Sequence, residues 1–223
     1  GNLPKIVIPV HFAGQSCDME AISKLGKKYN FRVIEDAAHA IGARYLNRTV
    51  GCCQYSDITV FSFHPVKVIT TGEGGAALTN NLDVAKKMQL LRSHGITRDS
   101  KEMTNSIVSD WYYEQISLGF NYRMTDFQAA LGISQLSRLD EYVAKRSKIA
   151  HWYDDQFENI PVNSLIQKES GESSYHLYVI RVKNREGERD RLYKYLRKGG
   201  IYVNLHYIPI YRQPFFNRKI RLL

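Results

Sequence analysis

Short apolar runs alternate with amphipathic segments through the first third of the chain. Residues 6–10 (IVIPV) have the length and character of a buried strand, and Asp18 then precedes apolar residues at helical spacing. Further strands are predicted at residues 31–34, 58–63 and 76–79. Strands that alternate with helices indicate βαβ units and a mostly parallel sheet, which binds its ligands at the carboxyl ends of the strands.

Residues 124–157 have a different pattern. They contain no proline and a single glycine, and their apolar residues recur at helical spacing, so one long helix or two stacked helices are expected. This helical segment is expected to bridge two domains. The predicted fold class is α/β, with a large domain in residues 1–143 and a small C-terminal domain in residues 144–223.

The C-terminal part of the chain is predicted to be a small α+β domain. Its expected strands are residues 175–182 and 201–205. A helix over residues 189–198 is expected between them, and Gly199 and Gly200 are expected to end it.

Composition indicates a folded globular protein. The chain has 223 residues, of which 43% are hydrophobic and 24% charged. No apolar run approaches the roughly 18 residues of a membrane helix, and the first residues lack the order of a signal peptide, so we expect a soluble, cytoplasmic protein without a membrane partner. The three cysteines, Cys17, Cys52 and Cys53, include no CxxC pair and fit neither a disulfide framework nor a metal site.

The net charge of +9 predicts a surface that attracts anions such as nucleotides, phosphates or nucleic acid. Much of the excess lies in residues 181–198 and near the C-terminus. Runs of charge are usually solvated surface, so charge alone is a weak reason to expect nucleic acid as a partner, and none is expected.

The residues with the most chemical potential gather where predicted strands end. Asp36 and His39 follow the second strand, and Ser62, His64 and Lys67 follow the third. All five side chains are expected to face one crevice. A desolvated lysine has a lowered pKa and can bond covalently to a carbonyl cofactor. A cofactor of pyridoxal type also needs an anion beside its ring nitrogen, and Asp36 is the candidate.

Each of these residues also has a plainer interpretation. Lys67 alone is far more often a surface lysine than a catalytic one. Asp36 is equally suited to capping a helix, and His39 and His64 are more often core or surface histidines. Only the grouping of the residues favours a site.

Six segments in a fixed order carry a resemblance to a known family. Between residues 7 and 215 they are IPVHFAGQ, VIEDAAHAIGARY, FSFHPVKVITTGEGGAALTN, LRSHG, LGFNYRMTDFQAALG and IYVNLHYIPIY. They resemble the sugar aminotransferases of the DegT type, a branch of the fold-type I pyridoxal-phosphate enzymes. Within that family, VHFAG, FSFHPVK and ITTGEGG are most similar to the aminotransferases that act on UDP-4-keto-6-deoxy-N-acetylhexosamines in pseudaminic acid biosynthesis.

The resemblance implies a set of residues that bind pyridoxal 5'-phosphate. Lys67 would hold the cofactor covalently, and Asp36 would pair with its pyridinium nitrogen. His39 would lie near the 3-hydroxyl or the ring, and Ser62 would donate its hydroxyl to the phosphate. Asn121, in the NxRM motif, would reach the phosphate of the neighbouring subunit's cofactor, which implies a homodimer with shared active sites.

The resemblance also implies the reaction. Glutamate would supply an amino group, which is then transferred to C4 of a nucleotide-linked 4-keto-6-deoxy sugar to give a 4-amino sugar nucleotide. His64 and His206 resemble residues on the sugar-nucleotide side, and Arg123 is expected near the substrate.

One departure from the family is relevant to this expectation. The family begins upstream of IPVHFAG with a helix whose N-terminal amides bind the cofactor phosphate, and relatives continue beyond HYIPIYRQPFF, so the chain is expected to be truncated at both ends. The large domain would then be incomplete on its N-terminal side. A non-catalytic binding module stays open as an alternative, as does a sugar dehydratase of the same fold, although that relative has histidine in place of Lys67.

Overall fold

The computed structural model describes residues 2–105, 109–182 and 187–216. It divides into two compact units. The first comprises Gly1–Glu158 and Ser164–Val179, and the second comprises Asn159–Asn163 and Ile180–Leu223. The candidate site residues of the two predicted strand ends all lie in the first unit.

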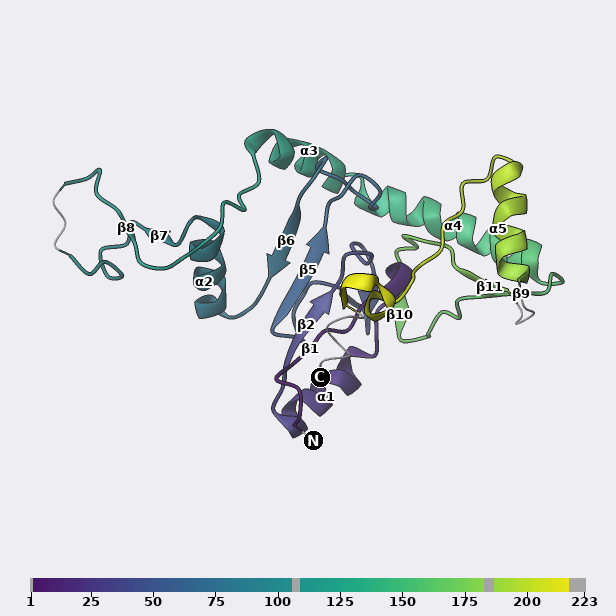
Figure 1. Cartoon of the computed structure of the whole chain (residues 1–223), viewed down its shortest axis with the longest axis horizontal. Helices are drawn as coiled ribbons and strands as arrows, with labels where there is room; N and C mark the ends of the chain where they lie inside the picture. The colour runs from purple at the N-terminus through teal and green to yellow at the C-terminus, as the bar shows by residue number, and fades with distance from the viewer. Residues whose placement is uncertain (1, 106–108, 183–186, 217–223) are drawn as a thin grey trace. The chain divides into compact units, whose positions relative to one another are not determined.

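A four-stranded sheet organises the first unit. Its strands are β1 (Ile6–Val7), β2 (Arg32–Asp36), β5 (Ile58–Ser62) and β6 (Gly75–Leu78), in the order β1-β2-β5-β6. The β1–β2 and β2–β5 pairs are parallel and the β5–β6 pair is antiparallel, as the arrows in Figure 1 show. The predicted mostly parallel sheet is therefore confirmed: β2, β5 and β6 lie within two residues of the predicted positions, whereas β1 covers only the first two of the five residues predicted at 6–10.

Helix α1 (Met19–Tyr29) packs on this sheet and begins where the sequence predicts. The Asp18 carboxylate caps it by accepting a hydrogen bond from the Ala21 N–H at 3.1 Å. Met19 lies in a buried cluster with Val33 of β2 and with Tyr45. The Tyr45 hydroxyl also donates to the Asp18 carboxylate at 2.8 Å, so the same residue anchors the start of the helix and the core beneath it.

A second buried cluster follows β2 and consists of small residues around Phe61. Its other members are Ala37, Ala40 and Ala43. A short three-stranded sheet continues this region, formed by β3 (Arg44–Tyr45), β4 (Arg48–Thr49) and β10 (Gly171–Glu172). The alanines let the chain after Asp36 pass close to β5, and this proximity fixes the edge of the sheet where the candidate site lies.

Residues 124–157 contain two helices, which is the second of the two arrangements predicted from the sequence. They are α3 (Asp126–Leu136), which begins with a capping box between Thr125 and Gln128, and α4 (Leu139–Phe157). The first unit also contains α2 (Leu82–Arg92) and the pair β7 (Ile96–Thr97) and β8 (Glu114–Gln115).

Helix α4 belongs to the first unit. A Cβ added at Gly42 would lie 2.7 Å from Val143 Cγ2, which shows how closely this helix approaches the chain after β2. The predicted domain boundary between residues 143 and 144 falls inside α4, and the division into domains stays a prediction for the complete protein.

The second unit contains α5 (Glu188–Lys198), β11 (Ile180–Val182), a 3-10 helix, η2 (Ile210–Arg212), and all but the last residue of β9 (Val162–Ser164), which pairs with β11. The predicted helix and its glycine end are confirmed, because Gly199 is the C-cap of α5. Only residues 180–182 of the predicted strand over 175–182 are a strand. The strand predicted at residues 201–205 is wrong: these residues form no strand within the described part of the chain, since the Ile201 N–H turns back to the Leu196 carbonyl at 2.9 Å.

No helix in the described ranges has the length and apolar character needed to cross a membrane.

Candidate active site

The carboxyl ends of β2 and β5 lie at one edge of the sheet. Asp36 is the last residue of β2 and Ser62 the last residue of β5. Asp36 is in register with Val60, and the Ala37 N–H donates to the Val60 carbonyl at 2.9 Å. The sheet therefore brings together the two strand ends that carry the predicted carboxylate and hydroxyl.

Lys67 lies in a tight turn immediately beyond β5. Its N–H donates to the His64 carbonyl at 2.9 Å, and Pro65 stands between the two residues. The Thr71 N–H donates to the Phe63 carbonyl at 3.0 Å, which closes the loop back on the strand end. Lys67 is thus outside any helix, as its proline and glycine neighbours predict.

The environment of Lys67 lowers the pKa of its amine. The residue is half-buried, and desolvation lowers the pKa of its amine, while the Asp36 carboxylate raises it; the net pKa lies below that of an ordinary lysine. A larger fraction of this lysine is therefore unprotonated and nucleophilic near neutral pH. The same balance shows that Asp36 acts electrostatically on Lys67.

Asp36→Asn is expected to lower the pKa of Lys67 further, because it removes the carboxylate that raises it while desolvation stays. The pH midpoint for modification of the Lys67 amine by cyanate, followed by peptide mass spectrometry without cofactor, should move to lower pH. Glu73→Gln is the matched control, since Glu73 is an exposed carboxylate of the same loop that contacts His64 and not Lys67. A midpoint that stays or rises in Asp36→Asn would show that the two groups do not interact.

His39 is held by the turn that follows Val10. The 3-10 helix η1 (Phe12–Gly14) brings the Ala13 N–H to His39 Nδ1 at 3.3 Å. In the neutral ring this bond places the proton on Nε2. The His39 ring also lies against the His176 ring, with centroids 4.4 Å apart and planes at 45°.

The segment around His176 is a part of the site that the sequence did not predict. The Ser174 hydroxyl donates to the His39 carbonyl at 3.1 Å, and the Leu177 N–H donates to the Ala13 carbonyl at 3.2 Å. Gly14 permits this approach: its φ is +105°, and a Cβ there would lie 2.8 Å from Ser174 Oγ. The only sequence signal was a histidine in SSYHL, at the start of a segment predicted to be a strand.

Ser62 and His64 are neighbours on the loop. The His64 N–H donates to Ser62 Oγ at 3.4 Å. Ser62 accepts in this bond, so its own hydroxyl hydrogen can be donated to an anion such as a phosphate. His64 is exposed, with Nε2 3.9 Å from Glu73 Oε1, so its predicted place on the substrate side rests on the sequence resemblance.

The structure does not bring every predicted residue to this edge. Asn121 and Arg123 are exposed on the segment before α3, where Asn121 forms an antiparallel bridge with Ser93. His206 belongs to the second unit. The predicted roles of these three residues stay predictions.

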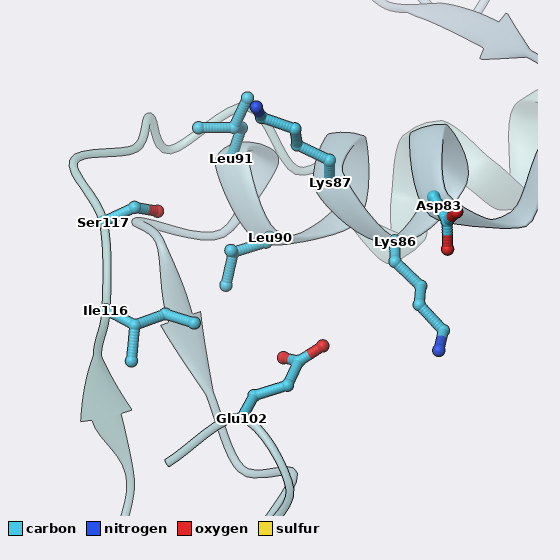
Figure 2. Close-up of a pocket in the computed structure, with 8 residues that line it drawn as sticks. All are labelled: Asp83, Lys86, Lys87, Leu90, Leu91, Glu102, Ile116 and Ser117. Atoms are coloured by element: carbon cyan, nitrogen blue, oxygen red, sulfur yellow. The ribbon is translucent and has the colours of Figure 1, made fainter. Parts of the chain in front are cut away.

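A cavity of about 470 Å³ lies elsewhere in the first unit, between α2 and the segments that follow β7 and β8 (Figure 2). It is lined by acidic, basic and apolar side chains together, which gives it no net preference for an anion. None of the predicted site residues lines it. Its lining comprises Asp83, Lys86, Lys87, Leu90, Leu91, Glu102, Ile116 and Ser117.

The residues at the strand ends fit pyridoxal phosphate. Lys67 supplies a half-buried amine of lowered pKa, Asp36 a carboxylate whose charge reaches that amine, and Ser62 a hydroxyl that can be donated. These are the groups that a carbonyl carbon, a ring nitrogen and a phosphate require.

Comparisons with known proteins agree with this chemistry. A transaminase of Campylobacter jejuni, UDP-4-amino-4,6-dideoxy-N-acetyl-beta-L-altrosamine transaminase, is 43% identical over 213 residues, which are 95% of this chain and 54% of the relative. The spore coat polysaccharide biosynthesis protein SpsC of Bacillus subtilis is 37% identical, over 96% of this chain and 56% of its own. The chain thus spans about half the length of the curated relatives it matches.

Solved structures give the same result. PseC of Helicobacter pylori, an aminotransferase involved in the biosynthesis of pseudoaminic acid, superimposes with a TM-score of 0.86 at 34% identity, over 96% of this chain and 55% of that one. The PLP form of a putative sugar aminotransferase of Streptococcus pneumoniae has a TM-score of 0.84 at 31% identity, over 96% and 57% of the two chains. The family description DegT/DnrJ/EryC1/StrS aminotransferase matches residues 3–222. The predicted fold-type I aminotransferase fold is therefore confirmed, and the chain belongs to the DegT/DnrJ/EryC1/StrS aminotransferase family.

Proposed function

We propose that the protein is a PLP-dependent sugar-nucleotide aminotransferase. Its substrate would be a nucleotide-linked 4-keto-6-deoxy sugar, its amino donor glutamate and its product the 4-amino sugar nucleotide. The observation that carries the proposal is the half-buried Lys67, of lowered pKa, under the influence of the Asp36 carboxylate at the shared edge of β2 and β5. Similarity to the Campylobacter jejuni transaminase and to PseC supports the choice of substrate.

Each residue has a distinct task in this proposal. Bound pyridoxal phosphate would supply an electron-withdrawing ring through which an amino group can leave one carbon and be delivered to another. Lys67 would hold the cofactor and, when released, move a proton at the substrate carbon as general acid and base. Asp36 would keep positive charge on the ring nitrogen, and Ser62 would donate its hydroxyl to the phosphate. His39 would lie beside the 3-hydroxyl.

Four further residues are proposed to complete the site. Asn121 would reach the phosphate in the neighbouring subunit of a homodimer. Arg123, His64 and His206 would face the sugar nucleotide. A cytoplasmic location is part of the same proposal, supported by the free thiols of Cys17, Cys52 and Cys53, which suit a reducing compartment.

Incubation of the protein with pyridoxal phosphate, glutamate and a UDP-linked 4-keto-6-deoxy-N-acetylhexosamine tests the function. We expect the 4-amino sugar nucleotide and 2-oxoglutarate in equal amounts, measured by mass spectrometry. A dehydrated sugar would identify a dehydratase instead. Cofactor binding without any product would favour a binding module.

Subunit complementation tests the shared site. Mixing Lys67→Ala chains with Asn121→Ala chains should restore part of the activity that each variant lacks, because one of the two sites in a mixed homodimer keeps both residues. Mixed dimers should first be demonstrated by native mass spectrometry. If they form and stay inactive, Asn121 serves its own subunit or no cofactor.

A further inference from the structure

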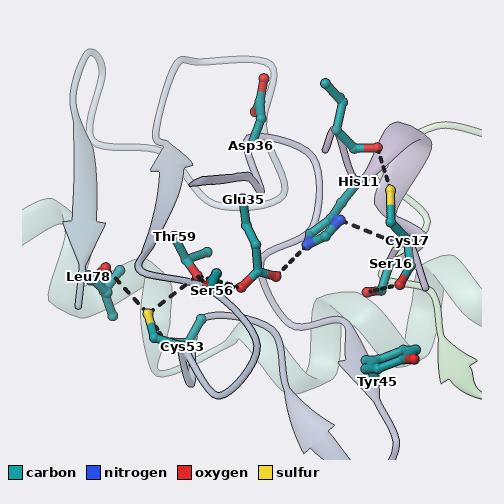
Figure 3. Close-up of polar contacts among 12 residues, drawn as sticks. His11, Ser16, Cys17, Glu35, Asp36, Tyr45, Cys53, Ser56, Thr59 and Leu78 are labelled. Carbon is teal, nitrogen blue, oxygen red and sulfur yellow. Dashed lines mark hydrogen bonds and ion pairs between the residues drawn. The ribbon is translucent and has the colours of Figure 1, made fainter. Parts of the chain in front are cut away.

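His11 and Glu35 form a buried pair on the side of β2 opposite Asp36. His11 Nε2 lies 2.7 Å from Glu35 Oε2, and the two residues are 0% and 5% exposed. Successive strand residues point to opposite faces, and Figure 3 shows Glu35 pointing toward His11 while Asp36 points the opposite way. Neither partner of the pair has a role in the proposed reaction.

The pair is embedded in a complete hydrogen-bond network. Glu35 Oε1 accepts hydrogen bonds from the hydroxyls of Ser56 and Thr59, the latter at 2.9 Å. The Cys17 N–H donates to His11 Nδ1 at 3.2 Å (Figure 3). When the His11 ring is neutral, every side-chain nitrogen and oxygen of the pair is bonded, and the residues involved come from three separate segments of the chain. A buried pair of this kind is often no more stabilising than apolar residues of equal volume. Its contribution is therefore sought in the positions that its hydrogen bonds fix.

The ionisation of the pair is suited to a fixed geometry. Burial raises the pKa of Glu35, but the hydrogen bonds from His11 and Ser56 lower it more, so the net pKa is below the ordinary value and the carboxylate stays ionised. Burial lowers the pKa of His11, whereas its contacts with Cys17 and Glu35 raise it to about 9. The bond from Cys17 N–H to Nδ1 belongs to the neutral ring, but the Nε2–Glu35 bond exists in both charge states.

The segment that carries His11 also binds the main chain of Asp36. The His11 N–H donates to the Asp36 carbonyl at 3.0 Å, and the Asp36 N–H donates to the Pro9 carbonyl at 2.9 Å. Val10, between them, forms a parallel bridge with Asp36. Both the N–H and the carbonyl of Asp36 are thus bonded to residues 9–11, and the His11 side chain binds Glu35, the residue before Asp36.

We infer that the His11–Glu35 pair is a positioning device that fixes the Asp36 carboxylate relative to Lys67. This inference rests on the proposed function, in which the carboxylate must meet the cofactor ring at a set distance from Lys67. Both residues are positioning residues and not catalytic ones, because they face the core.

The pKa of Lys67 in the cofactor-free protein reports the position of Asp36, because the carboxylate raises it. His11→Ala should shift the midpoint of cyanate modification at Lys67 in the same direction as Asp36→Asn and by no more than that variant does. Glu35→Gln keeps the volume of the core and should give the same direction if His11→Ala does not fold. In an Asp36→Asn background both shifts should disappear, since they act through Asp36.

Tyr45→Phe is the matched control. It removes a hydrogen bond of 2.8 Å to Asp18 in the same unit, but Tyr45 does not bind the backbone of Asp36. We expect it to lower the melting temperature without moving the Lys67 midpoint. If Tyr45→Phe shifts the Lys67 midpoint as much as His11→Ala does, the effect of the pair is a general loss of stability and not the positioning of Asp36.

The outcomes separate this inference from the function on which it rests. If Asp36→Asn moves the midpoint and neither His11→Ala nor Glu35→Gln does, the positioning role is wrong and the proposed site stands. A shift in Glu35→Gln that persists without Asp36 would be a direct effect of charge and would also overturn the inference. If Asp36→Asn itself does not move the midpoint, Asp36 does not act on Lys67, and the observation that carries the proposed function fails together with this inference.

Discussion

Lys67→Ala is expected to reduce amino transfer by more than about 10³-fold, because it removes both the attachment of the cofactor and the group that moves the proton. Proton transfer by a positioned side chain alone contributes about 10²–10⁴-fold. The fold should survive, since Lys67 lies in a turn, is only half-buried and belongs to neither buried cluster, and a change in the free energy of unfolding of about 1 kcal/mol or less is expected.

Steady-state kinetics with glutamate and the keto sugar nucleotide measure the loss, and thermal melting measures the stability. Lys67→Arg is the informative control: it keeps a positive charge in the turn, but a guanidinium stays protonated and is not a nucleophile. Both variants should be equally inactive. Substantial turnover in either one would contradict the proposed role of Lys67.

Asp36→Asn is expected to lower kcat by on the order of 10²–10³-fold, the range found when one preorganised electrostatic group is removed from an active site. The amide can still accept the hydrogen bond that the Ala38 N–H donates to Asp36 Oδ1 at 3.1 Å, so the strand end should keep its conformation. What the variant loses is the negative charge beside the ring nitrogen.

His39→Asn should be much milder. A neutral hydrogen bond contributes about 0.5–1.5 kcal/mol, which corresponds to roughly 2- to 10-fold in rate. Measurement of kcat for both variants, with cofactor saturation checked by absorbance, compares the two effects. Equal losses would mean that Asp36 is not the residue that stabilises charge on the cofactor.

The sequence predicted the parts of the fold that depend on local pattern. Asp18 was recognised before α1 because a carboxylate caps a helix from a fixed position, and Gly199 was recognised after α5 because glycine ends helices. Strand and helix alternation predicted a mostly parallel sheet, and β2 and β5 are parallel although β3 and β4, and no helix, lie between them. This order alone placed Asp36 and Ser62 at one edge of the sheet.

Contacts between residues far apart in the sequence could not be predicted from local sequence patterns. His176 lies against His39 although 137 positions separate them, and the backbone bonds of Ser174 and Leu177 that bring it there have no sequence signature. The His11–Glu35 pair has no sequence signature for a similar reason: Glu35 alternates with Asp36 along β2, but no local pattern identifies a partner 24 positions away.

The strand predicted at residues 201–205 shows a different limit. Its residues have the apolar, β-branched character of a strand, but a strand also needs a neighbour to pair with. Ile201 instead bonds back to Leu196 at the end of α5. The residue types of a segment indicate that it can form a strand, but it forms one only where a neighbouring strand is available for hydrogen bonding.

Covalent capture of pyridoxal phosphate tests the central claim most directly. The protein is incubated with the cofactor, reduced with borohydride, digested and analysed by mass spectrometry, with Lys67→Ala treated in parallel. The account predicts a phosphopyridoxyl group on Lys67, formed at low cofactor concentration and absent from the variant. Capture spread over surface lysines, or undiminished in Lys67→Ala, would contradict it.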